Sequence, residues 1–224
     1  MGIPGDSKYR GTEFMAGMEG EDPVKKEERI TAFKETHSYL FNCYDDWIKE
    51  DQILDAETSY YIATEMLKKH STPPIDEDCL NGFLESIYDK KTEYKGIFIS
   101  AMINTLYEDE RISIYPDGQK ISYIGMNNEE KEIFVWGWLH DFAGINMKGG
   151  ILEIMQGVSG KGIGKGMEGG TISIGDAYGY KVNTDTQLSQ NIKGGEIYYN
   201  SRCVWPEITF GDSAKKWGRK LLLR

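Results

Sequence analysis

The sequence predicts an α+β protein, in which an amino-terminal helical bundle is followed by a short right-handed parallel β-helix, with a β-hairpin at the junction. Two observations carry this prediction. Up to about Asp109, apolar residues recur at spacings of three and four, as on the buried face of a helix. Beyond it, a phrase of one apolar residue, one charged residue and two glycines starts at Met147, Met167 and Ile192, at intervals of 20 and 25 residues. A period of this size, with one short strand-like run after each phrase, is typical of a solenoid.

Four helices are expected in the first part. Aspartates that can cap a helix stand before the first three, at Asp22, Asp55 and Asp76, and a proline follows Asp22 at the first helical position. The fourth helix, about 94–107, is apolar on most sides and is expected in the centre of the bundle, although 97–99 also fit a strand. The first helix is expected to be long, because one apolar face continues through Ile30, Phe33, His37, Leu40, Phe41, Tyr44, Trp47 and Ile48.

The period changes at Arg111. Two alternating runs, 112–114 and 121–124, flank a proline and a glycine suited to a tight turn, and together they predict the hairpin. About five coils are then expected between Met126 and Asp212, the outer two imperfect, with Met126 as the equivalent of Met147 one coil earlier.

Glycines mark the corners of the predicted coils. Fourteen of the 26 glycines fall between 144 and 195, where no helical period exists. Glycine reaches positive φ without a steric clash, which sharp corners require. The paired glycines of the three phrases are therefore predicted to be structural: Gly149, Gly150, Gly169, Gly170, Gly194 and Gly195.

The phrases Gly160-x-Gly162-x-Gly164 and Met167-x-Gly169-Gly170-x-Ile172-x-Ile174 resemble the glycine-rich repeat of the GXGXG β-helix domain. That domain is the carboxy-terminal domain of the large subunit of glutamate synthase, and it also occurs in the C subunit of formylmethanofuran dehydrogenase. The resemblance covers about 126–200 and implies a structural, interdomain element without catalytic residues. The polar stretch 180–190 departs from the repeat, and the helical half has no counterpart in the family.

Composition narrows the function classes. The chain has 39% hydrophobic and 28% charged residues and a formal net charge of -10, which disfavours a nucleic-acid partner. No apolar run approaches the roughly 18 residues of a transmembrane helix. Three scattered cysteines fit free thiols in a reducing compartment, so a cytoplasmic location is expected.

These patterns divide the chain into four expected segments. Residues 1–14 look like a cloning leader before a native start at Met15 or Met18, 15–110 are the α-helical domain, and 111–212 are the β-helix domain. A basic amphipathic tail, 213–224, completes the chain and is expected to contact a partner or the acidic helical half through Lys215, Lys216, Arg219 and Lys220.

No cofactor or metal ion is expected. The run from Gly164 to Gly169 has the spacing of a dinucleotide fingerprint, yet a strand follows it where that motif needs a helix. Exposed backbone N–H groups near Lys161 and Lys165 are a weaker candidate for an anion site, with a solvated corner as the alternative. The acidic clusters lack the spacing of a calcium loop.

His140 and Asp141 are the candidates for catalysis, because a carboxylate can orient a histidine as a base. Adjacent residues of a strand point to opposite faces, however, and no serine or cysteine is placed to complete a nucleophilic set. Packing in a cap of the solenoid is the alternative role. Candidate ligand-binding residues are aromatic ones near the junction of the two parts, which can line a groove for a sugar or flat ligand: Trp136, Trp138, Tyr178 and Tyr180.

The sequence favours a noncatalytic scaffold or protein-interaction module, of the kind that serves as a subunit-like component of a larger assembly. The alternative is an enzyme or small-ligand-binding protein with an aromatic-lined site at the junction. A solenoid has two open ends whose strand edges need covering, by the hairpin, the tail or another subunit. A protein partner or a homo-oligomer is therefore expected.

Overall fold

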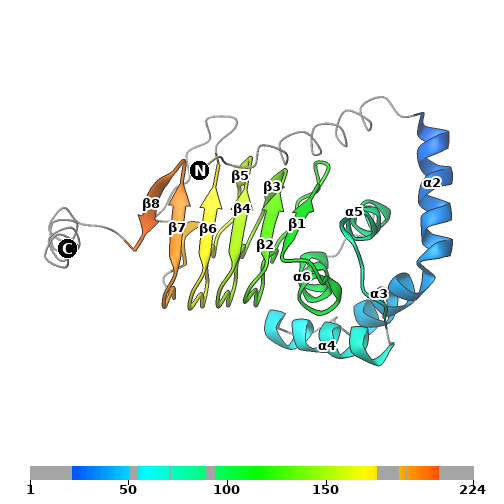
Figure 1. The fold of residues 1–224 in the computed structure, drawn as a ribbon, viewed down its shortest axis with the longest axis horizontal. Helices are drawn as coiled ribbons and strands as arrows, with labels where there is room; N and C mark the ends of the chain where they lie inside the picture. Colours follow the sequence, from blue (N-terminus) through cyan, green and yellow to red (C-terminus); the bar gives the residue numbers. More distant parts are fainter. Residues whose placement is uncertain are drawn as a thin grey trace, which may run out of the picture.

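The computed structural model describes residues 22–50, 55–70, 72–88, 94–175, 187–189 and 191–206. Within these residues a group of helices precedes a stack of parallel strands, as the predicted α+β class requires. The helices gather at one end of the stack, and the strands follow one another away from them in chain order (Figure 1).

The helical part contains five helices in the described residues, one more than expected. The expected long first helix is wrong, because the chain breaks at His37, whose φ is -110° and ψ 31°. There the His37 N–H donates to the Phe33 carbonyl at 2.9 Å, and the imidazole stacks on the Phe33 ring at 4.1 Å. The break lets the first segment pack on α5 while the second packs on α4. The helices are α2 (Pro23–Thr36), α3 (Ser38–Glu50), α4 (Ala56–Lys69), α5 (Glu77–Ser86) and α6 (Lys95–Leu106).

The three aspartate caps occur where they were predicted. Asp22 accepts from Val24 N, Asp55 from the backbone of Glu57 and Thr58, and Asp76 from Cys79 N, at 2.7–3.0 Å. Residues 97–99 are helical, and the central part of α6 is buried. Each cap satisfies backbone N–H groups that a helix leaves unpaired at its first turn.

Five parallel strands stack in register to form the main sheet of the solenoid. Every second side chain points inward, so that Ile112, Ile133, Leu152, Ile172 and Ile197 form one buried column. The strands are β1 (Arg111–Ile114), β2 (Glu132–Val135), β4 (Ile151–Ile154), β6 (Thr171–Ile174) and β7 (Glu196–Tyr199), and β8 (Arg202–Trp205) pairs antiparallel with β7. A second sheet joins β3 (Trp138–Leu139) to β5 (Gly157–Val158).

The predicted hairpin is wrong. Strand β1 pairs in parallel with β2, and Ile121 forms a parallel bridge with Leu139 instead of pairing with 112–114. The turn itself exists, since Gln119 N donates to Pro116 O at 2.9 Å, but it is a corner of the first coil. The solenoid therefore starts at Arg111. The last expected repeat, 208–212, lies outside the described residues.

The first coil is also in a different register from the predicted one. Glu132 pairs with Ile151, which is 19 residues further on. Asn128, rather than Met126, is consequently the equivalent of Met147. Asn128 is buried, and its amide replaces the apolar contact by bonding both the N–H and the carbonyl of Lys131, at 3.0 and 2.8 Å.

One corner of the coils explains the spacing of the G-x-G-x-G run. In each of three successive coils, three alternating residues of this corner have a positive φ. Backbone groups of the corner bond to the neighbouring coil, as in Gly144 N to Ile124 O at 2.9 Å and Asn146 N to Lys165 O at 2.8 Å. The left-handed region favours glycine and then asparagine, which is the observed choice at most of these positions. The three sets are Tyr123, Gly125 and Asn127; Phe142, Gly144 and Asn146; and Gly162, Gly164 and Gly166.

Helices α5 and α6 cover the β1 end of the solenoid. The free edge of β1 is satisfied by two side chains of α5. Asn81 donates to Ser113 O and accepts from Tyr115 N, both at 2.9 Å, while Glu77 accepts from Ser113 N at 2.8 Å. One continuous apolar core runs from Leu40 in α3 to Ile197 in β7. The helices thus cover one of the two ends that the hairpin, the tail or another subunit was expected to cover.

Candidate ligand cleft between helix α4 and the solenoid

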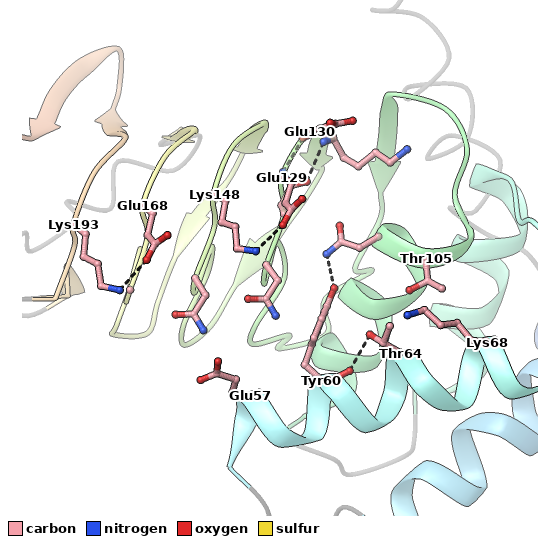
Figure 2. Close-up of a pocket in the computed structure, with 16 residues that line it drawn as sticks. Glu57, Tyr60, Thr64, Lys68, Thr105, Glu129, Glu130, Lys148, Glu168 and Lys193 are labelled. Atoms are coloured by element: carbon pink, nitrogen blue, oxygen red, sulfur yellow. Dashed lines mark hydrogen bonds and ion pairs between the residues drawn. The ribbon is translucent and has the colours of Figure 1, made fainter.

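An open cleft of about 880 Å³ lies between α4 and the coil corners of the solenoid, and we call it the polar cleft (Figure 2). One wall is a face of α4, and the other is a set of side chains contributed by successive coils. Part of α6 lies between the two walls. The lining residues are Glu57, Tyr60, Thr64, Lys68, Asn104, Thr105, Asn127, Asn128, Glu129, Glu130, Lys131, Asn146, Lys148, Gly166, Glu168 and Lys193.

The helix wall is polar because α4 places Glu57, Tyr60, Thr64 and Lys68 three or four residues apart, on one face. Tyr60 points from α4 toward the solenoid (Figure 2), and its hydroxyl accepts from Asn104 Nδ2 at 2.8 Å. Burial raises the pKa of Tyr60, so the hydroxyl keeps its proton. Asn104 Nδ2 also donates to Met126 O at 3.0 Å, which ties α6, α4 and the solenoid together at this point.

The solenoid wall carries a ladder of alternating charge. Glu129, Lys148, Glu168 and Lys193 occupy one position in four successive coils. Lys148 Nζ lies 2.6 Å from Glu129 Oε1, and Lys193 Nζ lies 2.8 Å from Glu168 Oε1 (Figure 2). All four side chains are more than half exposed. We call these four residues the charge ladder.

Three members of the charge ladder have shifted pKa values. The hydrogen bond that Lys148 donates to Glu129 raises the pKa of Lys148, and the hydrogen bond that Lys193 donates to Glu168 raises the pKa of Lys193. The same Lys193 bond lowers the pKa of Glu168. Each shift favours the charged form of its group, so Lys148, Glu168 and Lys193 present fixed charges rather than groups that exchange protons near neutrality.

The described lining of the cleft is charge-balanced and rich in amides. Among the described residues, four glutamates and four lysines line it, in a protein whose formal net charge is -10. Asn127 and Asn146 occupy equivalent positions in successive coils, with φ of 54° and 52°. Neither histidine nor cysteine is among the lining residues. The arrangement offers hydrogen-bond donors and acceptors together, without a strong potential of either sign.

The predicted His140–Asp141 pair lies in a second, smaller cavity of about 290 Å³, with Lys120, Ser122, Tyr123 and Phe142. The expectation that the two side chains point apart is wrong, since His140 Nδ1 lies 3.0 Å from Asp141 Oδ2. Strand β3 ends at Leu139, so the alternation of a strand does not apply to this pair. Asp141 also accepts from Lys161 N at 2.8 Å, and its own N–H donates to Ser122 Oγ at 3.2 Å.

Of the predicted aromatic residues, Trp136 and Trp138 are described, and neither is among the residues that line the polar cleft. Trp136 stacks on Tyr115, with ring centroids 6.4 Å apart and an interplanar angle of 10°, and its buried Nε1 has no hydrogen-bond partner among the described residues. The Trp138 ring packs against Gly157, so closely that a Cβ added to this glycine would lie 2.8 Å from the ring. Tyr178 and Tyr180 lie outside the described residues, as do the basic side chains of the predicted tail.

The glycine run gives no anion site in the structure. Gly164 N donates to Ala143 O and Gly166 N to Asn191 O, at 2.9 and 3.1 Å, so these N–H groups join coils. Lys165 Nζ lies over the Phe142 ring, 5.5 Å from its centroid. Over the described ranges, no group of three or more His, Cys, Asp or Glu residues is arranged to hold a metal ion.

The three cysteines are unpaired. Burial raises the pKa of Cys43 and of Cys79 to about 11, so both remain protonated thiols and weak nucleophiles. In the part of the chain that the structure describes, no helix has the length and apolarity needed to cross a membrane.

No protein-family model matches the chain, and neither a curated protein nor a solved structure matches it.

Sequence reasoning missed the polar cleft, although part of its signal was visible. The charged residue of each repeated phrase is Lys148, Glu168 or Lys193, and its sign alternates along the chain. Stacked coils place such residues in one column, which predicts a charge ladder. The opposing wall had no comparable signal, because the position of α4 depends on its packing against α6.

Proposed function

We propose that the chain is a noncatalytic binding module, in which the solenoid is a scaffold and the polar cleft holds a ligand. The observation that carries this proposal is the joint construction of the cleft. Its walls come from α4 and from the charge ladder, and Asn104 bonds both sides at 2.8 and 3.0 Å. A surface assembled from two parts and held by a shared core is preorganised, which lowers the entropic cost of binding.

The noncatalytic part of the proposal rests on the chemistry of the cleft. An acid–base catalyst needs a group whose pKa lies near the working pH. The shifted pKa values of Lys148, Glu168 and Lys193 all move away from neutrality. The resemblance to the GXGXG β-helix domain supports the same proposal, since that domain is a structural element in its families. A cytoplasmic location is part of this proposal, and so is a protein partner or a second copy of the chain that binds outside the polar cleft.

A photo-cross-linking experiment tests it. A benzophenone amino acid replaces Lys68 in the helix wall of the cleft, and a matched variant carries it at Ser173, on the solvent side of β6. After irradiation in a lysate of the source organism, adducts are identified by intact mass and by peptide sequencing. We expect a defined adduct from the Lys68 position that disappears when Asn146→Gly is added. The same adducts from both positions would contradict the proposal.

A second candidate function is a small-molecule site in the cavity around His140. It is favoured by one observation, the 3.0 Å contact of His140 Nδ1 with Asp141 Oδ2, which orients the imidazole. The measurement is a ligand screen that follows the His140 ring resonances by NMR, with His140→Gln as the control. Resonances that do not move for any class of compound would remove this candidate.

A further inference from the structure

We infer that the ligand of the polar cleft is a neutral oligosaccharide that lies along the solenoid axis. This inference rests on the proposed binding function and names its ligand class. All but one of the 16 lining residues carry a polar group in the side chain, the exception being Gly166. Sites for apolar small molecules are lined mainly by hydrophobic side chains. A ligand that suits this cleft must itself be polar over most of its surface.

Charge selects against polyanions and polycations. The four lysines and four glutamates cancel, and the charge ladder pairs its members at 2.6 and 2.8 Å. A nucleic acid or a phosphorylated chain needs positive potential along its path. The described lining residues have no excess of positive charge, so an uncharged ligand loses the least on leaving water.

The side chains suit hydroxyl groups. A hydroxyl both donates and accepts, and an amide such as that of Asn127 or Asn146 offers both functions within one side chain. The carboxylates and ammonium groups of the ladder add charge-assisted hydrogen bonds, which are the stronger kind. On the opposite wall the ring of Tyr60, which reaches from α4 toward the ladder (Figure 2), adds an apolar face for the C–H side of a sugar ring.

The repeat distance favours a glycan over an extended peptide. The wall repeats once per coil, because Asn127 and Asn146, and likewise Glu129 and Lys148, are equivalents in successive coils. Neighbouring strands lie about 4.8 Å apart, whereas an extended peptide advances about 3.3 Å per residue. One hexose with its linkage is about as long as one coil is thick. A glycan can thus place one ring beside Asn127 and the next beside Asn146, while a peptide falls out of step.

The test is a titration of the full chain with cellotetraose, maltotetraose and chitotetraose, followed by calorimetry and by the side-chain amide signals of asparagine. Asn146→Gly removes one amide from the wall and keeps a backbone with φ of 52°. The matched control is Asn200→Gly, with φ of 46°, outside the cleft. We expect at least one tetrasaccharide to bind, and Asn146→Gly to weaken it about five- to tenfold, with no change for Asn200→Gly.

The other outcomes separate this inference from the proposed function. Binding of a Glu-Lys repeat peptide that Asn146→Gly weakens, with no tetrasaccharide bound, overturns the glycan and leaves the binding module standing. Tighter, salt-sensitive binding of a heparin tetrasaccharide also overturns it. If none of these probes binds and the Lys68 cross-linker captures nothing, both proposals fail. Equal weakening by Asn146→Gly and Asn200→Gly overturns the assignment to the cleft.

Discussion

The helical part and the solenoid build their shares of one core in different ways. In the helices, large rings fill the interior, and Tyr44, Trp47 and Phe83 surround Phe98 with centroids 5.0–5.8 Å apart. In the solenoid, aliphatic side chains stack in columns such as that of Leu152. The first region depends on the volume of its side chains, and the second depends also on how closely neighbouring backbones approach.

The paired glycines show this dependence on backbone approach. A Cβ added to Gly149 would lie 2.0 Å from Glu129 O, and one added to Gly194 would lie 2.3 Å from Glu168 O. The second glycine of each pair has a positive φ, which is 82° in Gly170. A solenoid with thin coils therefore constrains residue choice at its corners, where a helical bundle constrains it in its centre.

The largest expected effect is in the helical core. Trp47 is fully buried, and its Nε1 donates to Ser59 O at 3.0 Å. Trp47→Ala is expected to lower the free energy of unfolding by about 3–5 kcal/mol, because it leaves a cavity and removes the hydrogen bond to Ser59 O. Urea denaturation followed by circular dichroism measures it. The control is Trp138→Ala, at a half-buried position in the solenoid. An equal loss of stability there would show that the stability of the helical part does not depend especially on the volume of its rings.

A pair of glycines sharpens the comparison in the solenoid. Gly118 and Gly170 both have positive φ, but a Cβ on Gly118 meets open space, whereas one on Gly170 meets Gly149 O at 2.6 Å. Gly170→Ala is expected to cost about 2–4 kcal/mol and Gly118→Ala about 1–2 kcal/mol. Thermal and urea unfolding of both variants measure the difference. Equal losses of stability would mean that glycine is required at these positions by the positive φ alone, and not by the close approach of neighbouring coils.

The contact between the two regions gives the next effect. Asn81→Ala removes the partners of Ser113 O and Tyr115 N at the edge of β1. Leaving such groups buried and unpaired is expected to cost about 1–3 kcal/mol. Hydrogen exchange should show faster exchange of the Tyr115 amide than in the unmodified chain. An unchanged Tyr115 amide would indicate that α5 does not satisfy this edge.

The smallest expected effect is a pH dependence at the outer face of the bundle. Burial alone would raise the pKa of Glu85, but the hydrogen bonds and charges of Arg29 and Lys26 outweigh it and lower the pKa. A lowered folded-state pKa gives stability that is present above the unfolded value, about 4.3, and is lost as the pH falls through the folded value. Because both cations are more than a third exposed, we expect less than about 1 kcal/mol.

The measurement is the urea midpoint between pH 6 and pH 3 for the unmodified chain and for Glu85→Gln. The variant should lose less stability on acidification, because it has no carboxylate to protonate at this position. A pH profile that is the same in both chains would show that the Glu85 pairs contribute nothing measurable.

Much of the fold follows from local sequence, and the exceptions have one physical cause. The sequence predicts the strands Ile151–Ile154 and Thr171–Ile174, because each follows the same glycine phrase at the same spacing. For the run 112–114 the sequence predicts a hairpin, because alternation is the same in parallel and antiparallel strands and the nearby turn suggests 121–124 as the partner. The partner in the structure is the parallel strand that begins at Glu132. The break at His37 was missed because apolar spacing continued through it.

The candidate site was less predictable than the fold. Its solenoid wall follows from the repeat, since one charged residue per phrase becomes one column of the charge ladder. Its helix wall depends on where α4 packs, and that is decided by contacts with α6 that no local pattern specifies. The pair His140 and Asp141 was identified from residue types, but its geometry depended on where β3 ends.

The central structural claim is that both regions belong to one cooperative unit, which fixes α4 beside the charge ladder. Native-state hydrogen exchange in rising urea tests it most directly, at Met102 in α6 and Leu152 in β4, both fully buried. Because one apolar core joins them, we expect both amides to reach the same opening free energy and the same urea dependence. If Met102 opens in a separate step at lower urea while Leu152 stays protected, the two regions are independent, and a cleft built between them has no fixed geometry.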